Sequence, residues 1–147
     1  MAGPIRRFAE FHWENTDVLA YKEEGSAPFK AITRQILFHH RELKSELRYF
    51  EMAAGGYSTL ERHSHVHAVL ILRGEGQCLV GGEVFDIGKN DLVTIEPMTW
   101  HQFRANADEP LGFLCMVNVD RDKPQLPTAG EREALADNPA VKTFFGE

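Results

Sequence analysis

Short strand-like segments separated by turn signals dominate the chain between residues 31 and 119. Their β-branched, aromatic and aliphatic residues favour strands, and turns such as Gly81-Gly82 supply the positive φ angles of two-residue hairpin loops. Strands that recur at such short spacing are typical of an all-β sandwich or barrel. We therefore expect an all-β fold with a turn at 53–56 and strands at 31–38, 47–52, 67–72, 77–80, 83–87, 92–95, 100–104 and 111–119.

The length of the chain, 147 residues, suits one domain with a real core. We expect an N-terminal arm and loop over 1–30, a barrel over 31–119 and a C-terminal tail over 120–147 that packs on the barrel. In this tail the pattern predicts a short helix over 130–137, which stops before Pro139 because proline cannot continue a helix.

Composition excludes several classes of partner. The net charge of −6 argues against a nucleic-acid backbone, whose binding relies on clustered Lys and Arg. No apolar run approaches the ~20 residues that cross a bilayer, and the N-terminus lacks the apolar region of a secretory signal. We therefore expect a cytoplasmic protein without a nucleic-acid or membrane partner. Cys78 and Cys115 lie in apolar runs and are predicted to be buried free thiols.

Four potential metal ligands, Glu61, His63, His65 and His67, occupy alternate positions before an apolar run. Alternate side chains of an extended strand share one face. Buried imidazoles and carboxylates need partners, because an unpaired buried polar group costs about 1–3 kcal/mol, and one metal ion would satisfy several of them. The outermost pair would be ~20 Å apart on a straight strand, so a shared ion requires a bend in the chain.

The run from Gly55 to Gly74 resembles the first motif of the cupin superfamily, with Glu61 in the first His place, His63 in the second and His67 in the usual Glu place. The resemblance covers about residues 45–119. It implies a double-stranded β-helix, or jelly-roll barrel, with an N-terminal arm and a short C-terminal helical tail.

Residues 90–104 resemble the second cupin motif, and His101 keeps the place of its histidine. The resemblance implies the ligand set Glu61, His63, His67 and His101, with His65 as an alternative ligand or as a group that orients a ligand. A competing set is His63, His65 and His101 with His67. A pocket that binds a small molecule without metal is a further alternative.

The resemblance also implies one divalent transition metal ion per chain, with Fe, Mn, Ni, Co, Zn and Cu all compatible with mixed imidazole and carboxylate ligands. The expected function is oxygenase, isomerase or lyase chemistry on a small organic molecule. The alternative is a non-catalytic cupin that binds or senses a small molecule. Candidate acid–base groups are His65 and Glu96. We further expect a homodimer, because the outward face formed by Ala68, Leu70 and Leu72 needs a cover.

Overall fold

The computed structural model describes residues 3–147 and consists mainly of antiparallel strands. The strands are β1 (Phe8–Ala9), β2 (His12–Trp13), β3 (Leu19–Ala20), β4 (Lys30–His40), β5 (Ser45–Tyr57), β6 (His67–Arg73), β7 (Glu75–Val80), β8 (Glu83–Gly88), β9 (Leu92–Ile95), β10 (His101–Ala105) and β11 (Leu111–Asn118). Two short helices follow, α1 (Ala129–Leu135) and α2 (Pro139–Phe144). The predicted all-β fold with a helical tail is confirmed.

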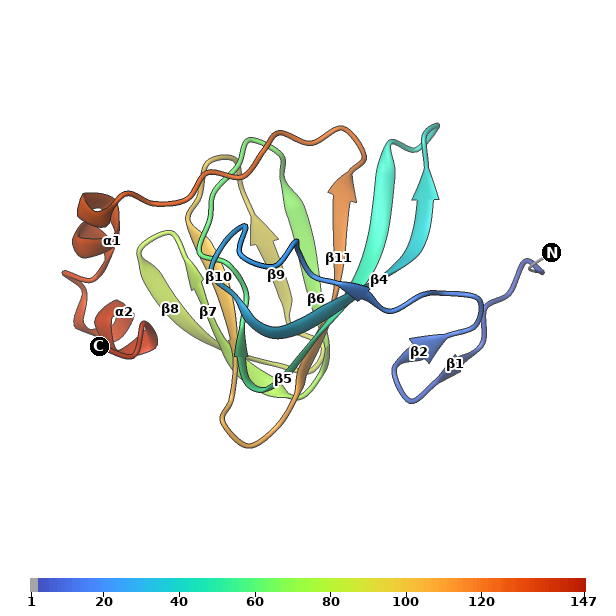
Figure 1. Ribbon diagram of the computed structural model, residues 1–147, viewed down its shortest axis with the longest axis horizontal. Coiled ribbons are helices and arrows are strands. Elements are labelled where there is room, and N and C mark those ends of the chain that lie inside the picture. Colours follow the sequence, from blue (N-terminus) through green and yellow to red (C-terminus); the bar gives the residue numbers. More distant parts are fainter. Residues whose placement is uncertain (1–2) are drawn as a thin grey trace.

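One sheet of nine strands curls into the barrel (Figure 1). Its main path runs β8-β7-β10-β5-β11-β6-β9, with β4 on the free side of β5 and β3 beside β4. The long β5 pairs with β11 along Ser45–Met52 and reaches β10 only at Tyr57. This strand therefore joins the two halves of the curled sheet, and the ends of β6 and β10 are brought toward one interior.

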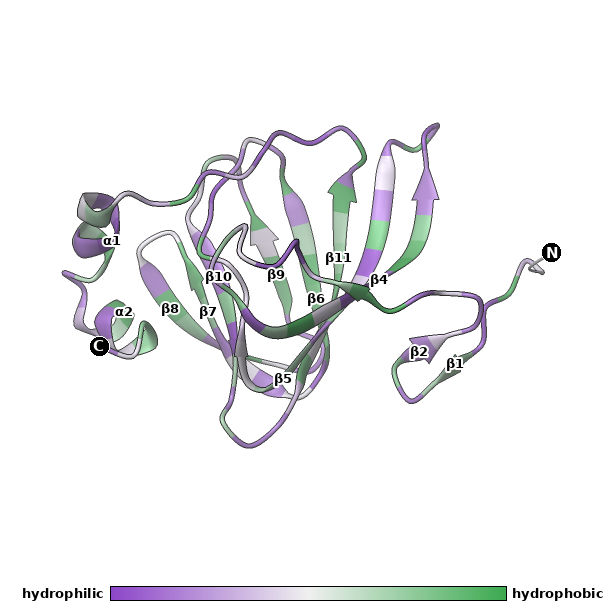
Figure 2. Ribbon diagram, in the orientation of Figure 1, coloured by the Kyte–Doolittle hydropathy of each residue, from purple (hydrophilic) through white to green (hydrophobic). Residues whose placement is uncertain are grey.

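The core is formed by side chains at alternate positions of the strands. Val69 and Ile71 on β6, and Phe113, Cys115 and Val117 on β11, are buried at every second position. Such alternation places one set of side chains inside the curled sheet and leaves the other set outside. Figure 2 shows the contrast between the mostly hydrophobic central strands and the hydrophilic tail that follows β11.

The turn that we expected at 53–56 does not form, because β5 continues to Tyr57. Gly55 has a φ of 74°, which glycine adopts without strain, and this lets the strand change direction without ending. Gly56 then lies so close to Ala53 O and Lys30 O that a Cβ would meet them at 2.9 and 2.8 Å. The glycines therefore mark an irregularity within a paired strand.

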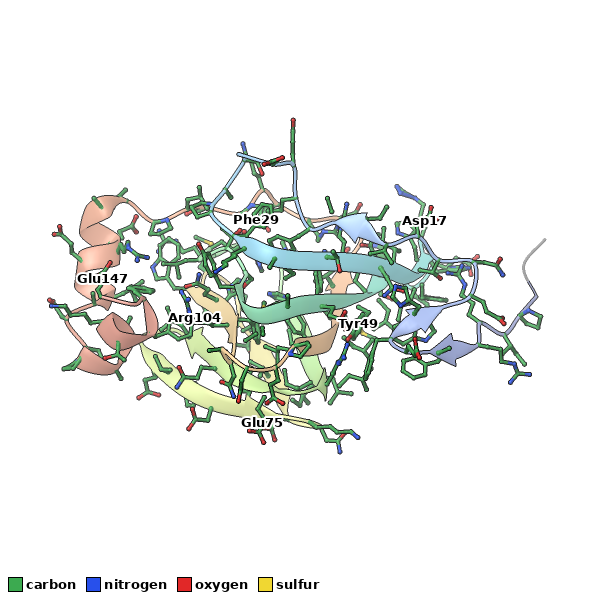
Figure 3. All side chains as sticks on the ribbon, turned by 60° about the horizontal axis from the view of Figure 1, so that its bottom comes forward. Asp17, Phe29, Tyr49, Glu75, Arg104 and Glu147 are labelled. Atoms are coloured by element: carbon green, nitrogen blue, oxygen red, sulfur yellow. The ribbon has the colours of Figure 1, made fainter. Side chains whose placement is uncertain are left out.

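The N-terminal arm contains the β1–β2 hairpin, which lies beside Tyr49 of β5 (Figure 3). The rings of Phe11 and Trp13 have their centroids 6.0 and 5.2 Å from that of Tyr49. Gln35 on β4 adds a hydrogen bond from its Nε2 to Phe11 O. Aromatic packing therefore holds this arm against the outside of the sheet.

The C-terminal tail runs along the open end of the barrel and then forms both helices (Figure 1). Thr128 and Glu131 form a capping box that starts α1. Pro139 occupies the first turn of α2, a helix that the sequence analysis did not predict, since proline is compatible with a helix start. Val141 and Phe144 of α2 are buried with Leu79 of β7. Neither helix is long and apolar enough to span a bilayer.

Candidate metal centre

Three histidines from distant parts of the chain meet inside the barrel. His63 precedes β6, His67 begins β6 and His101 begins β10. One ring nitrogen of each lies within 4.8 Å of the others, and His63 and His101 are only 2% and 3% exposed. Of the four ligands in the preferred set, these three share a common centre.

The bend that a shared ion requires is present between β5 and β6. Residues 58–66 leave the regular strand, so the chain turns between Glu61 and His67 instead of continuing straight. Reciprocal backbone hydrogen bonds join Glu61 and His101 (N···O 3.2 and 3.0 Å), and Met98 N donates to His63 O at 2.7 Å. The loop before β6 is thereby fixed to the loop before β10, and their histidines face each other.

Hydrogen bonds on the outer ring nitrogens orient the inner ones. His63 Nδ1 lies 2.7 Å from His65 O, and His101 Nδ1 lies 2.9 Å from Thr99 O. A carbonyl oxygen only accepts, so each Nδ1 carries the proton and the Nε2 of the neutral ring has a free lone pair. The Nε2 atoms of His67 and His101 are 3.3 Å apart, as expected for two nitrogen donors roughly 2.1 Å from one ion.

The electrostatic environment keeps these rings neutral. Burial lowers the pKa of His101 to about 4, and burial is also the main reason that the pKa of His63 is lowered. The pKa of His67 is lowered chiefly by burial and then by the neighbouring His101 and His63. Metal binding requires unprotonated imidazole, so the three residues are in the form that binds a metal at neutral pH.

Glu61 lies at the edge of this cluster and forms an ion pair with a residue of the N-terminal segment. Its Oε2 accepts a hydrogen bond from Lys22 Nζ at 2.7 Å, and Glu61 is 8% exposed. Glu61 and Lys22 both line the cavity that contains the histidines. The carboxylate is therefore close to the centre, with Lys22 as its present partner.

His65 is held by the tail. Its Nδ1 lies 2.8 Å from Asp122 Oδ1, and its ring stacks on His63 with centroids 3.6 Å apart. Hydrogen bonds from the backbone N–H of Ser64 and then from His65 lower the pKa of Asp122, so its carboxylate is charged. The stack and the hydrogen bond to Asp122 place His65 beside His63.

The histidines line a cavity of about 140 Å³. Its wall also carries three cationic side chains and one thiol, those of Lys22, Arg48, Arg121 and Cys115. Cys115 Sγ lies 3.0 Å from His67 Nδ1 and 3.5 Å from Arg48 Nη2. Glu96, an acid–base candidate from the sequence, is exposed and does not line this cavity.

The sequence analysis missed the cavity roles of Lys22, Arg121 and Cys115. Lys22 reaches the site from before the barrel strands, and Arg121 from the tail behind them. Cys115 was correctly predicted to be a buried free thiol. The available signal was its parity on β11, where it shares the inward face with Phe113 and Val117.

Comparison with known proteins agrees with the fold. The model of the family described as "Cupin domain" matches residues 48–117. Together with the 52% sequence identity to a cupin 2 conserved barrel domain protein described below, this match shows that the chain belongs to the cupin superfamily.

Particular relatives cover nearly the whole chain. The 1-methylthio-D-xylulose 5-phosphate methylsulfurylase of Rhodospirillum rubrum is 56% identical over 143 residues, which are 97% of this chain and 92% of the relative. A cupin 2 conserved barrel domain protein of Rhodopseudomonas palustris is 52% identical with a TM-score of 0.89, covering 95% of this chain and 97% of that one. A cupin-2 domain structure from Rhodospirillum rubrum is 54% identical with a TM-score of 0.88, covering 98% and 97% of the two chains.

Proposed function

We propose that this protein is a metal-dependent enzyme that removes the methylthio group from a 1-methylthio ketose 5-phosphate. The proposal rests on the identity of 56% with the methylsulfurylase, which extends over 97% of the chain. One observation of the site carries it further: the cavity combines three convergent histidines with cationic side chains and a thiol. The histidines suit a metal that binds the carbonyl of such a substrate, the cationic side chains suit its phosphate, and the thiol suits its thioether sulfur.

The donor set fits a divalent transition metal. His63, His67 and His101 would hold the ion, and three protein ligands leave positions open, as in catalytic metal sites. We propose Glu61 as a fourth ligand that binds when its pairing with Lys22 is released. The ion would supply Lewis acidity for a ketose carbonyl. Fe, Mn, Ni, Co, Zn and Cu remain the candidate metals, since imidazole and carboxylate ligands suit several of them.

The cationic side chains of the cavity wall are suited to the phosphate. Arg48 and Arg121 both approach Glu46, at 3.7 and 3.6 Å, and Lys22 pairs with Glu61. The Arg121 side chain is the most exposed of the three cations, at 28% against 23% for Lys22 and 14% for Arg48. We therefore assign the phosphate to Arg121, with Lys22 as a second contact, because a guanidinium binds phosphate oxygens in a bidentate manner.

Incubation with 1-methylthio-D-xylulose 5-phosphate tests the proposed function. The protein is purified without a tag, its metal content is measured, and it is given substrate together with a soluble thiol. Mass spectrometry of the reaction should show the sugar phosphate with hydrogen in place of the methylthio group. Binding without turnover would support the non-catalytic alternative. Absence of both binding and turnover would contradict the proposed substrate.

We also propose that the protein forms a homodimer through the outer face of β6, β9 and β11. Strand register places Leu92, Leu70 and Leu114 side by side across these strands, and Met116 beside Ala68. Leu92 is 66% exposed and Met116 52% exposed. A contiguous apolar patch on a sheet face gains free energy when a second copy covers it.

A further inference from the structure

We propose that the protein has a second ligand site, between β10 and the helical tail, which binds a small aromatic carboxylate that carries a hydrogen-bond donor opposite its carboxyl group. The site is a cavity of about 480 Å³, lined by Gln102 and Arg104 from β10 and by Leu126, Arg132 and Phe145 from the tail. We call it the tail cavity. Neither the proposed metal centre nor the proposed reaction uses any of these residues.

Strand alternation separates the tail cavity from the histidine cavity. Along β10, His101 and Phe103 line the histidine cavity, whereas Gln102 and Arg104 line the tail cavity. Alternate residues of a strand face opposite sides of a sheet, so β10 is a wall that the two cavities share. Figure 3 shows Arg104 on the side of the barrel that faces the two helices. A ligand in the tail cavity therefore does not contact the proposed metal ion.

Arg104 is a half-buried cation with an unused donor. Its guanidinium carbon lies 4.7 Å from the ring centroid of Tyr57 and 5.3 Å from that of Phe144. Its Nε is buried, and no group of residues 3–147 accepts a hydrogen bond from it. None of the ion pairs between described residues includes Arg104. Burial is the main reason that the pKa of Arg104 is lowered, and the positive charge of Arg132 adds to this effect, which a bound anion would oppose.

Arg132 brings a second guanidinium to the tail cavity, and this one has an acidic partner. Its Nη2 lies 3.1 Å from Glu147 Oε1, and its guanidinium carbon lies 4.0 Å from the ring centroid of Phe145. Of the two cations that line the cavity, Arg104 is thus the one left without a carboxylate in the described chain. A monovalent carboxylate matches this single charge, and a guanidinium binds carboxylate oxygens in a bidentate manner.

Gln102 indicates what else the ligand must carry. Its side chain is buried, with the residue 5% exposed, and its Nε2 donates to Ser58 O at 2.8 Å. This bond fixes the orientation of the amide, because a carbonyl oxygen only accepts. The other amide atom, Oε1, is buried and receives no hydrogen bond from residues 3–147. An unpaired buried acceptor is costly, so a ligand with a hydroxyl or amino donor is favoured.

The spacing of these two groups indicates the shape of the ligand. Gln102 and Arg104 are two residues apart on one strand, so their Cα atoms are ~6.6 Å apart. Substituents at opposite positions of a benzene ring have a similar separation. Tyr57 and Phe145 also line the cavity, and their rings favour contact with an aromatic ligand. A benzoate with a hydroxyl or amino group in the para position combines these features.

Titration calorimetry of the untagged full chain tests the site with 4-hydroxybenzoate and 4-aminobenzoate. We expect each of these probes to bind at one equivalent per chain. Benzoate lacks the donor and should bind at least about fivefold more weakly, and 4-hydroxybenzamide lacks the charge and should bind at least about tenfold more weakly. Neither the substrate of the proposed function nor its turnover enters this experiment, so the two proposals fail independently.

Two variants with matched controls locate the bound probe. Arg104→Gln removes the unpaired charge and should weaken 4-hydroxybenzoate binding at least about tenfold. Arg34→Gln, at a half-exposed strand position outside the cavity, should not. Leu126→Glu places a repelling charge at the cavity on a residue that is 46% exposed, so it should weaken binding at least about threefold without disturbing the fold. Leu43→Glu, in the exposed turn between β4 and β5, is its control, and thermal unfolding is measured for all four variants.

Several outcomes would overturn the proposal. Absence of binding by both probes would show that the tail cavity is not a site for this class of ligand. Tighter binding of inorganic phosphate than of 4-hydroxybenzoate would overturn the choice of a carboxylate. Equal affinity for benzoate and 4-hydroxybenzoate would contradict the role of Gln102 Oε1. Binding that is lost in Arg121→Gln but unchanged in Arg104→Gln and Leu126→Glu would place the probe in the histidine cavity.

Discussion

At the scale of single residues, the site depends on imidazoles that are buried in their neutral form. His101 illustrates this: it is 3% exposed, its Nδ1 donates to a backbone carbonyl, and burial lowers its pKa to about 4. An unfolded chain titrates the same ring near pH 6.5. The folded and unfolded states therefore bind protons differently between these two values, and stability must depend on pH there.

We predict that the metal-free protein loses stability as the pH falls from about 7 to about 4. In this window the unfolded state protonates His101 while the folded state does not, so acid favours unfolding. A shift from 6.5 to about 4 corresponds to roughly 3 kcal/mol for this residue alone. Urea unfolding at several pH values measures the loss. His101→Gln should have a shallower pH dependence, and an unchanged slope would contradict the assignment.

Substitution of Glu61 and substitution of His65 should affect metal binding differently. Glu61→Gln should weaken metal affinity by at least roughly tenfold if the carboxylate leaves Lys22 and becomes a ligand, whereas His65→Ala should largely retain the metal. Elemental analysis by inductively coupled plasma mass spectrometry, performed at limiting metal, compares the two variants. Retention by Glu61→Gln together with loss by His65→Ala would favour the competing set that contains His65.

Substitution of Arg121 tests the proposal that this residue binds the phosphate of the substrate. Arg121→Gln should raise KM for the phosphorylated substrate by about tenfold or more with kcat changed only a few-fold, because a charge-assisted contact remote from the reacting bond binds ground state and transition state equally. Arg41→Gln, in the exposed turn between β4 and β5, is the matched control. Equal KM values for the two variants would place the phosphate elsewhere in the cavity.

At the scale of elements, the site is assembled by strand register and by two loops. Residues 58–66 and the loop before β10 carry His63 and His101, and their backbones are joined by the reciprocal hydrogen bonds of Glu61 and His101. The pairing of β11 with β6 sets Cys115 opposite Val69, two residues from His67. Elsewhere in the sheet, glycines leave room for neighbouring backbone and side chains.

Gly112 on β11 is the sharpest example, because a Cβ there would overlap the hydroxyl group of the buried Tyr49. We predict that Gly112→Ala lowers the free energy of unfolding by about 1–3 kcal/mol through overpacking. Gly82→Ala, at a turn position where an added Cβ meets nothing within 4 Å, should change it by less than about 0.5 kcal/mol. Chemical denaturation of both variants checks the difference, and equal stability would show that Tyr49 moves aside freely.

At the scale of the whole molecule, the proposed homodimer is the prediction to test. Sedimentation velocity of the wild-type protein should give the mass of two chains, and the double variant Leu92→Glu/Met116→Lys should sediment as one chain because charges oppose burial of the patch. Val66→Lys changes an apolar residue outside the strands that is about as exposed as Met116, and it should leave the assembly intact. A monomeric wild-type protein would contradict the proposal.

The sequence by itself determined the barrel and the histidines of the site. Alternation of apolar residues with turn signals indicated the strands from β4 to β11, since side-chain period and turn chemistry are local properties. The spacing in this part of the chain resembled the two cupin motifs, and the ligand set that it implied includes His63, His67 and His101, which meet in the structure. Local physics also explains the misread turn at 53–56, where glycine signalled an irregularity within β5 rather than its end.

Only the tertiary structure decided what surrounds these histidines. Lys22, Cys115 and Arg121 reach the cavity from positions far from the histidine row, and Cys115 is separated from His67 by 48 residues. Their placement depends on how β11 registers against β6 and on where the arm and tail cross the barrel. Those choices follow from the packing of the whole core, a non-local free energy that no short stretch of sequence contains.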